Sequence, residues 1–266
     1  MYQNERMDIL LQALLKEQDI RPAVNLNGMS ETEKRNLLRS LMNIRMPAPI
    51  GRDLLNIQDE YLQEERKSRK IVNADDLRRI DGHLALWQGD ITSLKIQAIV
   101  NAANSRMLGC FIPMHSCIDN IIHSRAGMQL RLACRQEMDR LHLQDQKTGI
   151  PIITPGYNLP AEYVIHVAGP IVYEHLDEKL KNQLAECYIN VLDLCREKKI
   201  RSVAFCCIST GEFHFPNEEA AEIAIGTVRD WLKKNPDTVD LVVFNVFKDK
   251  DKDRDIYEKL LGISEG

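Results

Sequence analysis

The sequence has no apolar run long enough to cross a bilayer and no excess of positive charge. A transmembrane helix needs about 20 consecutive, mostly apolar residues, so we expect no membrane-spanning segment. The 35 lysines and arginines are outnumbered by 39 aspartates and glutamates, and the net charge of −4 argues against broad nucleic-acid binding. Residues 1–18 carry charge throughout, unlike a signal peptide. These features predict a cytoplasmic protein in a reducing environment.

Internal repeats, low-complexity tracts and the H-E-x-x-H motif are also absent from the sequence. Without that motif, which supplies two histidine ligands from one helical face, an unrelated zinc hydrolase is a poor hypothesis. What is present is a chain of 266 residues with 44% hydrophobic and 28% charged residues, as in ordinary globular proteins. This length suits one large domain, or one domain with an extension.

The first part of the chain, residues 1–82, has helical patterning. Apolar residues recur at helical spacing in two stretches, Met7, Leu10, Leu11, Leu14 and Leu15, then Leu37, Leu38, Leu41 and Met42. A capping box at residues 30–33 precedes the second stretch, and the prolines at Pro47 and Pro49 interrupt the pattern. No titratable cluster suggests chemistry here, so we expect a helical extension that packs or binds a partner.

From His83 onward, short apolar runs alternate with longer amphipathic ones, the pattern of repeated strand–helix–strand units. The expected strands are residues 83–87, 96–100, 150–154, 163–167, 201–208 and 239–247. The helical period is clearest over residues 180–195. The sequence therefore predicts an α/β domain over residues 83–266.

Seven cysteines are spread along the chain, and two of them share a short loop with a histidine. Cys110, His115 and Cys117 have the spacing C-x4-H-x-C, and two thiolates with an imidazole suit zinc. Three protein ligands leave a fourth position open, as in catalytic zinc sites, although His123 is a candidate fourth ligand. The alternative is that these are ordinary buried cysteines of an apolar loop. The spacing by itself leaves both interpretations open.

Asn101, Asn104 and Asp119 flank this loop. Strand ends followed by small residues and a helix start are where α/β folds build ligand sites. The two asparagines are either turn formers or donors and acceptors for a sugar diol. Asp119 either caps the following helix or orients a water or a ribose hydroxyl beside the metal.

A second candidate loop has the sequence S-T-G-E-F-H-F-P over residues 209–216 and follows an apolar strand. Gly211 allows backbone amides to close on a phosphate, and the N-terminus of the following helix favours an anion. One glycine-containing loop between a strand and a helix is by itself weak evidence for a phosphate site. Two facing strand-to-helix loops would clamp a diphosphate, which strengthens the hypothesis of a ligand site.

Three further residues have both a structural and a functional interpretation. Asp90, in a G-D-I-T turn, is structural or accepts hydrogen bonds from an exocyclic amine such as that of adenine. Phe247 either stacks on a base or closes the core. His166 lies within an apolar strand, where a single histidine is more often a satisfied core residue than a ligand, and we favour that interpretation.

Taken in chain order, four of these stretches resemble the motifs of macrodomains, which bind ADP-ribose and, in the MacroD type, hydrolyse ADP-ribosyl bonds. The four stretches are G-D-I-T at 89–92, V-N-A-A-N-S at 100–105, Y-V-I-H-V-A-G-P at 163–170 and I-S-T-G at 208–211. The resemblance covers residues 83–262. It implies a macrodomain α/β fold, a three-layer α/β/α sandwich with a mixed central sheet, preceded here by the helical N-terminal extension.

The loop after V-N-A-A-N-S departs from the MacroD pattern. Members of that type carry a run of glycines before V-D-G, whereas residues 109–120 here read G-C-F-I-P-M-H-S-C-I-D-N. This loop resembles that of the zinc-dependent macrodomain branch of microbial proteins, which also has an extra helical N-terminal region. The resemblance implies that Cys110, His115 and Cys117 bind Zn2+ and that Asp119 matches the catalytic aspartate.

The resemblance also implies roles for the other candidates. Asp90 would hold the adenine amine, Ile91 would add a backbone contact, and Phe247 would stack on adenine. Asn101 and Asn104 would position the proximal ribose, with Asn104 completing the catalytic site. The loop that would wrap the diphosphate comprises Ser209, Thr210, Gly211, Glu212 and Phe213.

The activity implied by this resemblance is that of a zinc-dependent protein-ADP-ribose hydrolase, which removes mono-ADP-ribose from protein side chains, and carboxylate-linked substrates are plausible. Two alternatives remain open. One is a non-catalytic reader that binds ADP-ribose, and the other is a deacetylase of O-acetyl-ADP-ribose. The implied partners are ADP-ribose, mono-ADP-ribosylated proteins and, in this branch, a sirtuin-type ADP-ribosyltransferase with a lipoyl-carrier-like acceptor.

Overall fold

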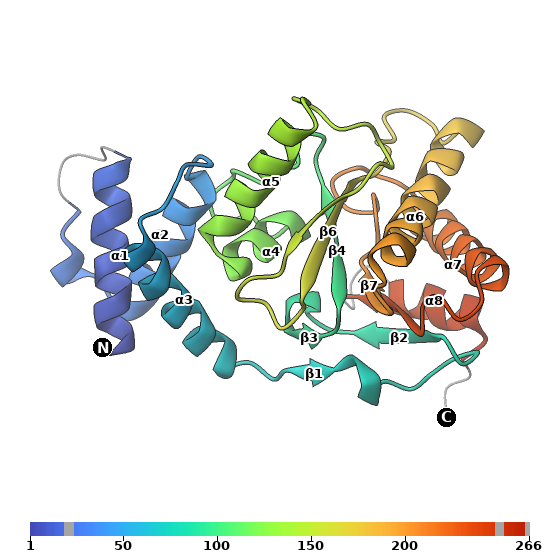
Figure 1. Cartoon of the computed structure of the whole chain (residues 1–266), viewed down its shortest axis with the longest axis horizontal. Helices are drawn as coiled ribbons and strands as arrows, with labels where there is room; N and C mark the ends of the chain where they lie inside the picture. The colour runs from blue at the N-terminus through green and yellow to red at the C-terminus, as the bar shows by residue number, and fades with distance from the viewer. Residues whose placement is uncertain (19–23, 248–252, 264–266) are drawn as a thin grey trace.

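A mixed six-stranded sheet forms the centre of the protein (Figure 1). The computed structural model describes residues 1–18, 24–247 and 253–263. The strand order is β2–β8–β7–β4–β6–β5, and neighbouring strands run parallel except β5, which is antiparallel to β6. The strands are β2 (Leu84–Gln88), β4 (Ala98–Ala103), β5 (Ile152–Pro155), β6 (Tyr163–Ala168), β7 (Ser202–Phe205) and β8 (Leu241–Val246).

The central strands are apolar over most of their length because both faces of the sheet are covered. Every residue of β8 is buried, and so is every residue of β6 after Tyr163. These apolar runs are the pattern from which the sequence predicted strands. The six expected strands are confirmed to within a few residues. Two short strands were not expected, β1 (Val72–Asn73) and β3 (Leu94–Lys95), which pair with each other. Two-residue strands have no detectable periodicity.

Helices cover both faces of this sheet (Figure 1). On one face α4 (Ile118–Ala126) contacts β4 and α5 (Met128–Arg140) contacts β5. On the other face, α6 (Glu178–Lys198), α7 (Asn217–Lys234) and α8 (Asp253–Leu261) pack beside one another. This three-layer α/β/α arrangement with a mixed sheet confirms the predicted fold class.

The helices are amphipathic rather than uniformly apolar. The longest, α6, has 21 residues and buries a stripe that includes Leu184, Cys187, Val191 and Cys195. No helix in the described ranges combines the length and the apolar character that a bilayer crossing requires. The cytoplasmic location expected from the sequence stays a prediction.

Three helices ahead of the sheet form a small core of their own at one end of the molecule (Figure 1). They are α1 (Gln3–Glu17), α2 (Glu31–Ile44) and α3 (Arg52–Lys67). The predicted capping box is confirmed, because Ser30 Oγ accepts from the backbone N–H of Glu33 at 3.3 Å and Glu33 accepts from the N–H of Ser30 at 2.7 Å. The helical N-terminal extension is therefore present as expected.

The extension is bonded to the sheet domain rather than held apart from it. Met128 of α5 belongs to the apolar core of the three N-terminal helices. Gln58 of α3 accepts from the backbone N–H of Met128 at 2.8 Å and donates to the side chain of Gln129 at 2.6 Å. The domain boundary after residue 82 stays a prediction, and these contacts tie the two parts together across it.

Candidate functional site

A cleft lies at the carboxyl ends of the parallel strands β4, β6, β7 and β8, where α/β folds place ligand sites. Its cavity has a volume of about 240 Å3. Loops that follow the strands form most of its wall. Six of the predicted substrate-binding residues line it, namely Ser209, Thr210, Gly211, Glu212, Phe213 and Phe247.

The three predicted metal ligands come together beside this cleft. One donor atom each from Cys110, His115 and Cys117 lies within 4.8 Å of the other two, and Cys110 Sγ is 3.5 Å from His115 Nδ1. All three side chains are half-buried, and Cys117 itself lines the cleft. Burial raises the pKa of the Cys117 thiol to about 12, so metal binding would have to displace its proton. The donor set fits a tetrahedral zinc ion with one position left for a ligand.

The structure places His123, the candidate fourth ligand, in a different cluster. Its ring is buried with Cys134 and His166, and one donor atom from each of these three residues lies within 4.8 Å of the others. Burial lowers the pKa of His123 well below its usual value, so the ring is neutral. His123 Nε2 lies 3.5 Å from Asp119 Oδ1. His123 therefore belongs with the polar groups around Asp119 and not with the three donors.

Asp119 is the centre of a buried hydrogen-bond network. Asn101 Nδ2 donates to Asp119 Oδ1 at 2.7 Å, and Asn104 Nδ2 donates to Oδ2 at 3.4 Å. Burial raises the pKa of Asp119 to about 6, although the hydrogen bond from Asn101 acts in the opposite direction. At neutral pH the group is therefore a carboxylate that can take up a proton. The structure brings together the three residues that the sequence placed around the metal loop.

His166 is a core histidine that orients Asn101. It is fully buried in β6, and burial lowers its pKa to about 3, so the ring is neutral. Its Nδ1 lies 3.0 Å from Asn101 Nδ2, and its Nε2 lies 3.0 Å from Thr154 Oγ1. A neutral ring accepts from Asn101 at Nδ1 and donates to Thr154 at Nε2. The core interpretation is confirmed, and the ring also fixes the direction of the amide that holds Asp119.

The loop between β7 and α7 leaves its backbone open to the cleft. Ser209 has a φ of 66°, and its carbonyl accepts from the N–H of Phe215 at 3.0 Å. A Cβ on Gly211 would meet nothing within 4 Å. The helix α7 begins directly afterwards at Asn217, and its dipole favours negative charge at that end. Open space beside backbone amides and a helix N-terminus is what a phosphate group needs.

The same fold and motifs recur in known proteins. The Macro domain family matches residues 100–224. A "Protein-ADP-ribose hydrolase" of Treponema medium is 45% identical over 265 residues, which cover 98% of this chain and 100% of the relative. The chain belongs to the macrodomain family.

Two further similarities concern ligands and chain organisation. The crystal structure of the Trypanosoma brucei macrodomain in complex with ADP-ribose is 30% identical to this macrodomain at a TM-score of 0.66, covering 88% of this chain and 96% of that one. A "Probable bifunctional ADP-ribose hydrolase/ADP-ribosyltransferase" of Fusarium oxysporum f. sp. cubense is 40% identical over 261 residues. The match covers 90% of this chain and 43% of that longer protein.

The residues predicted to bind adenine lie in two different settings. Asp90 Oδ1 accepts from the N–H of Thr92 at 3.0 Å and from its hydroxyl at 2.6 Å, while Oδ2 pairs with Arg125. Ile91 is buried beside it. Phe247 instead lines the cleft with 53% of its surface exposed. The adenine-binding roles of Asp90, Ile91 and Phe247 stay predictions, and in this macrodomain both oxygens of Asp90 already have partners.

Several cleft residues were missed from the sequence. Asn245 lies within the apolar strand β8 and donates to the carbonyl of Gly89 at 2.9 Å, and a polar residue inside such a run was the available signal. Cys207 and Asp253 also line the cleft. Gly169 approaches residues 209–216, which we call the phosphate loop, so closely that a Cβ would lie 2.1 Å from Ser209 Oγ. These residues come from segments that are distant in sequence, so spacing could not group them.

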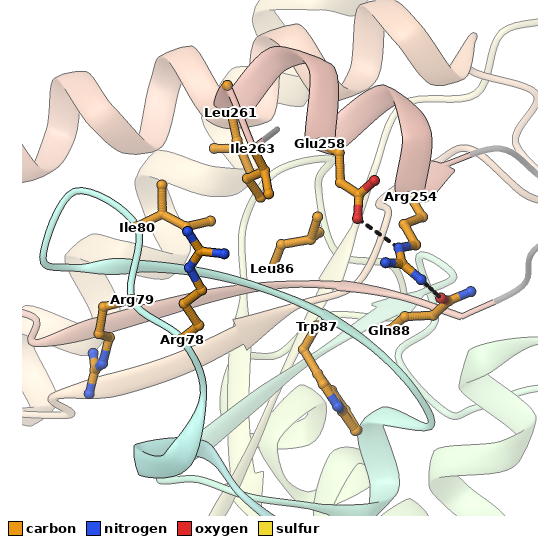
Figure 2. A pocket seen from close by; sticks show the side chains of 11 residues that line it. Arg78, Arg79, Ile80, Leu86, Trp87, Gln88, Arg254, Glu258, Leu261 and Ile263 are labelled. Atoms are coloured by element: carbon orange, nitrogen blue, oxygen red, sulfur yellow. Dashed lines mark hydrogen bonds and ion pairs between the residues drawn. The ribbon is translucent and has the colours of Figure 1, made fainter. Parts of the chain in front are cut away.

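A larger cavity of about 550 Å3 lies at the other edge of the sheet, between β2, α8 and the segment before β2 (Figure 2). Figure 2 shows Arg254 beside it, with its guanidinium hydrogen-bonded to Glu258 and to Gln88. Of the residues that the sequence singled out for chemistry, none lines the described part of this cavity. We therefore place the functional site of this macrodomain at the smaller cleft.

Proposed function

We propose that this macrodomain is a zinc-dependent protein-ADP-ribose hydrolase that removes mono-ADP-ribose from carboxylate-linked side chains. The observation that carries the proposal is the convergence of three metal donors, Cys110, His115 and Cys117, beside the same cleft that the phosphate loop lines. The name of the Treponema relative, which aligns over almost the whole chain, supports hydrolysis. The Trypanosoma complex supports ADP-ribose as the ligand.

Zinc would be held by the two thiolates and the imidazole of this loop. When bound, it would supply a Lewis acid that polarises an oxygen of the proximal ribose or of water. The two thiolates nearly neutralise the ion, so orientation by the surrounding residues matters at least as much as activation. Glu212 Oε1 lies 3.7 Å from His115 Nε2 and supports the ring from the cleft side.

The chain's own polar groups would then handle the ribose and the proton. Asp119 is a charged acceptor at neutral pH and is held by Asn101 and Asn104. It is the group suited to orient a ribose hydroxyl or a water molecule and to accept a proton from it. The asparagine amides fix the direction of its lone pairs, which is the preorganisation that catalysis requires.

The remainder of the ligand would lie along the cleft. Backbone amides from Ser209 to Phe213 would close on the diphosphate, helped by the dipole of α7. Phe247 would stack on adenine at the cleft wall. A carboxylate leaves readily without strong acid catalysis, which is why we propose an ester-linked substrate.

A sirtuin-type ADP-ribosyltransferase acting on a lipoyl-carrier-like protein would generate such a substrate. The printed name of the Fusarium relative, which joins a hydrolase to an ADP-ribosyltransferase, supports pairing of the two activities. We propose this partnership for the present macrodomain, and co-purification of the ADP-ribosylated carrier with this macrodomain would test it.

The test is release of ADP-ribose from a carboxylate-linked mono-ADP-ribosylated protein, before chelation, after chelation and after zinc is restored. Release that stops on chelation and returns with zinc supports the proposal. Release by verified metal-free protein contradicts zinc dependence. Retained ADP-ribose binding without any release favours a non-catalytic reader. Faster turnover of O-acetyl-ADP-ribose in a parallel assay favours the deacetylase alternative.

A further inference from the structure

The loop that carries the three metal donors is held by the N-terminal extension. This metal loop (residues 109–117) lies against α2, and Arg39 of α2 reaches it. Arg39 Nη2 donates to the backbone carbonyl of His115 at 2.8 Å and to Asn120 Oδ1 at 2.8 Å. The extension therefore bonds directly to the main chain of a metal ligand, across 76 positions of sequence.

A second residue on the same face of α2 makes parallel contacts. Asn43 lies one helical turn after Arg39, so the two side chains point the same way. Asn43 Oδ1 accepts from the backbone N–H of Met114 at 3.0 Å, and its Nδ2 donates to Ser124 Oγ at 2.8 Å. One face of α2 thus holds both the metal loop and the helix α4 that follows it.

Asn120, whose side chain accepts from Arg39, also contacts a second ligand through its backbone. Its backbone N–H donates to Cys117 Sγ at 3.4 Å, and its side chain donates to the carbonyl of Ile112 at 2.9 Å. Asn120 is fully buried, so its orientation depends on the few groups that contact its side chain. The guanidinium of Arg39 is one of those groups.

The opposite side of the loop is held by Arg131 of α5. It donates to the carbonyls of Leu108 at 2.7 Å and Cys110 at 3.3 Å, and also to the carbonyl of Asn43 at 2.7 Å. Its guanidinium lies 4.0 Å from the centre of the Phe111 ring. Each metal ligand therefore has a backbone or sulfur atom hydrogen-bonded from outside the loop. Arg39 bonds to His115 directly and to the side chain of Asn120, whose backbone N–H bonds to Cys117.

We propose that Arg39 is a positioning residue for the metal site, and that the N-terminal extension thereby sets the metal affinity of the macrodomain. The inference rests on the zinc site of the proposed function. The metal loop has no regular secondary structure, so a metal ion must otherwise order it at an entropic cost. Arg39 reduces that cost because it fixes the main chain of His115 and the side chain of Asn120 before the metal arrives. Both bonds come from one nitrogen, Nη2, of a rigid planar guanidinium, whereas the ammonium of a lysine keeps the charge but ends a flexible stem.

The experiment compares zinc affinity in the full chain for the parent, Arg39→Ala, Arg39→Lys and a control, Arg35→Ala. Arg35 lies one turn earlier on α2, is exposed and pairs with Glu31 and Glu65 inside the extension. Dissociation constants are measured by competition with a chromophoric chelator. We expect Arg39→Ala to weaken zinc binding roughly 10- to 100-fold, Arg39→Lys to weaken it less, and Arg35→Ala to leave it unchanged.

A second readout needs neither metal nor activity. Amide hydrogen exchange of the metal loop in metal-free protein should accelerate in Arg39→Ala and not in Arg35→Ala. An Arg39→Ala protein that retains the parent's zinc affinity overturns the inference, as does equal weakening by Arg35→Ala. If the parent itself binds no zinc, or binds it equally well after Cys117→Ala, the proposed metal site fails and the inference fails with it. If zinc binds through Cys117 but the Arg39→Ala substitution has no effect on its affinity, this inference is contradicted and the proposed metal site is not.

Discussion

Asn101 donates a hydrogen bond of 2.7 Å to the carboxylate of Asp119. The donor lies at the end of β4 and the acceptor in the first turn of α4, so the bond spans the whole metal loop. It directs one oxygen of a buried carboxylate, and Asn104 donates to the other at 3.4 Å. We expect the two residues to act as one unit, in which the amide orients the carboxylate and the carboxylate accepts a proton.

Substitution of that carboxylate by an amide of the same shape should remove turnover while retaining binding. In Asp119→Asn, the new side chain still accepts from Asn101 but no longer takes up a proton. We expect the turnover number to fall by about 100-fold or more, since positioned proton acceptors contribute about 100- to 10,000-fold. Single-turnover release of ADP-ribose and calorimetric binding of ADP-ribose measure the two effects. Turnover near that of the parent would exclude Asp119 as the proton acceptor.

The contact between Glu212 and His115 should contribute less to zinc affinity than the contact between Arg39 and His115. The carboxylate lies 3.7 Å from Nε2, and 70% of its side chain is exposed. Exposed pairs contribute little because water and salt screen them, so Glu212→Gln should weaken zinc binding by less than about fivefold. The chelator competition assay measures this. A larger loss than that of Arg39→Ala would mean that the cleft side, not the extension, orients the ligand.

Gly169 should be required for ligand binding. A Cβ at this position would lie 2.1 Å from Ser209 Oγ and 2.7 Å from Ile208 Cγ2, so Gly169→Ala must displace these two side chains where the phosphate loop begins. Overpacking of this kind costs about 1–3 kcal/mol, and we expect the dissociation constant of ADP-ribose to rise roughly tenfold or more.

The matched control for Gly169 is Gly226→Ala in α7, where an added Cβ meets nothing within 4 Å. That variant should bind ADP-ribose as the parent does and gain about 0.5–1 kcal/mol of stability, because alanine favours the helix. Calorimetry and thermal unfolding give both quantities. Unchanged binding in Gly169→Ala would show that the loop position is not set by this contact.

His166 should make the stability of the metal-free protein depend on pH. Burial lowers its pKa from 6.5 to about 3, so between these values the unfolded chain takes up a proton that the folded protein does not. The free energy of unfolding that depends on a neutral His166 is therefore at its full value above about pH 6.5. It falls steadily as the pH is lowered from about 6.5 towards about 3. Between pH 7 and pH 4.5 the loss due to this residue should be about 2–3 kcal/mol.

Denaturant unfolding at the two pH values provides the measurement. His166→Asn keeps an acceptor for Asn101 but does not titrate, so its free energy of unfolding should fall less between pH 7 and pH 4.5 than that of the parent. His175→Asn, which changes an exposed histidine, serves as the control. An equal fall in His166→Asn and in the parent would mean that other groups cause the acid sensitivity.

The amino-acid sequence by itself determined the local features. The six main strands follow from apolar runs, because burial on both faces requires them. The capping box at Ser30 follows from a pattern within four residues. The donor set of Cys110, His115 and Cys117 lies within one short loop, so spacing was enough to propose it. The phosphate loop could be proposed for the same reason, since a strand end, a glycine and a helix start are contiguous, and its role stays a prediction.

Only the tertiary structure decided how these parts meet. Periodicity does not encode strand order, and it is the order β8–β7–β4–β6 that brings Asn245, Gly169 and Ser209 to one cleft and sets His166 beside Asn101. The extension carried no local sign of a role, because Arg39 contacts His115 only when α2 packs on the metal loop. Hydrogen bonds between distant segments depend on the packing of whole elements, and that packing is a property of the complete fold.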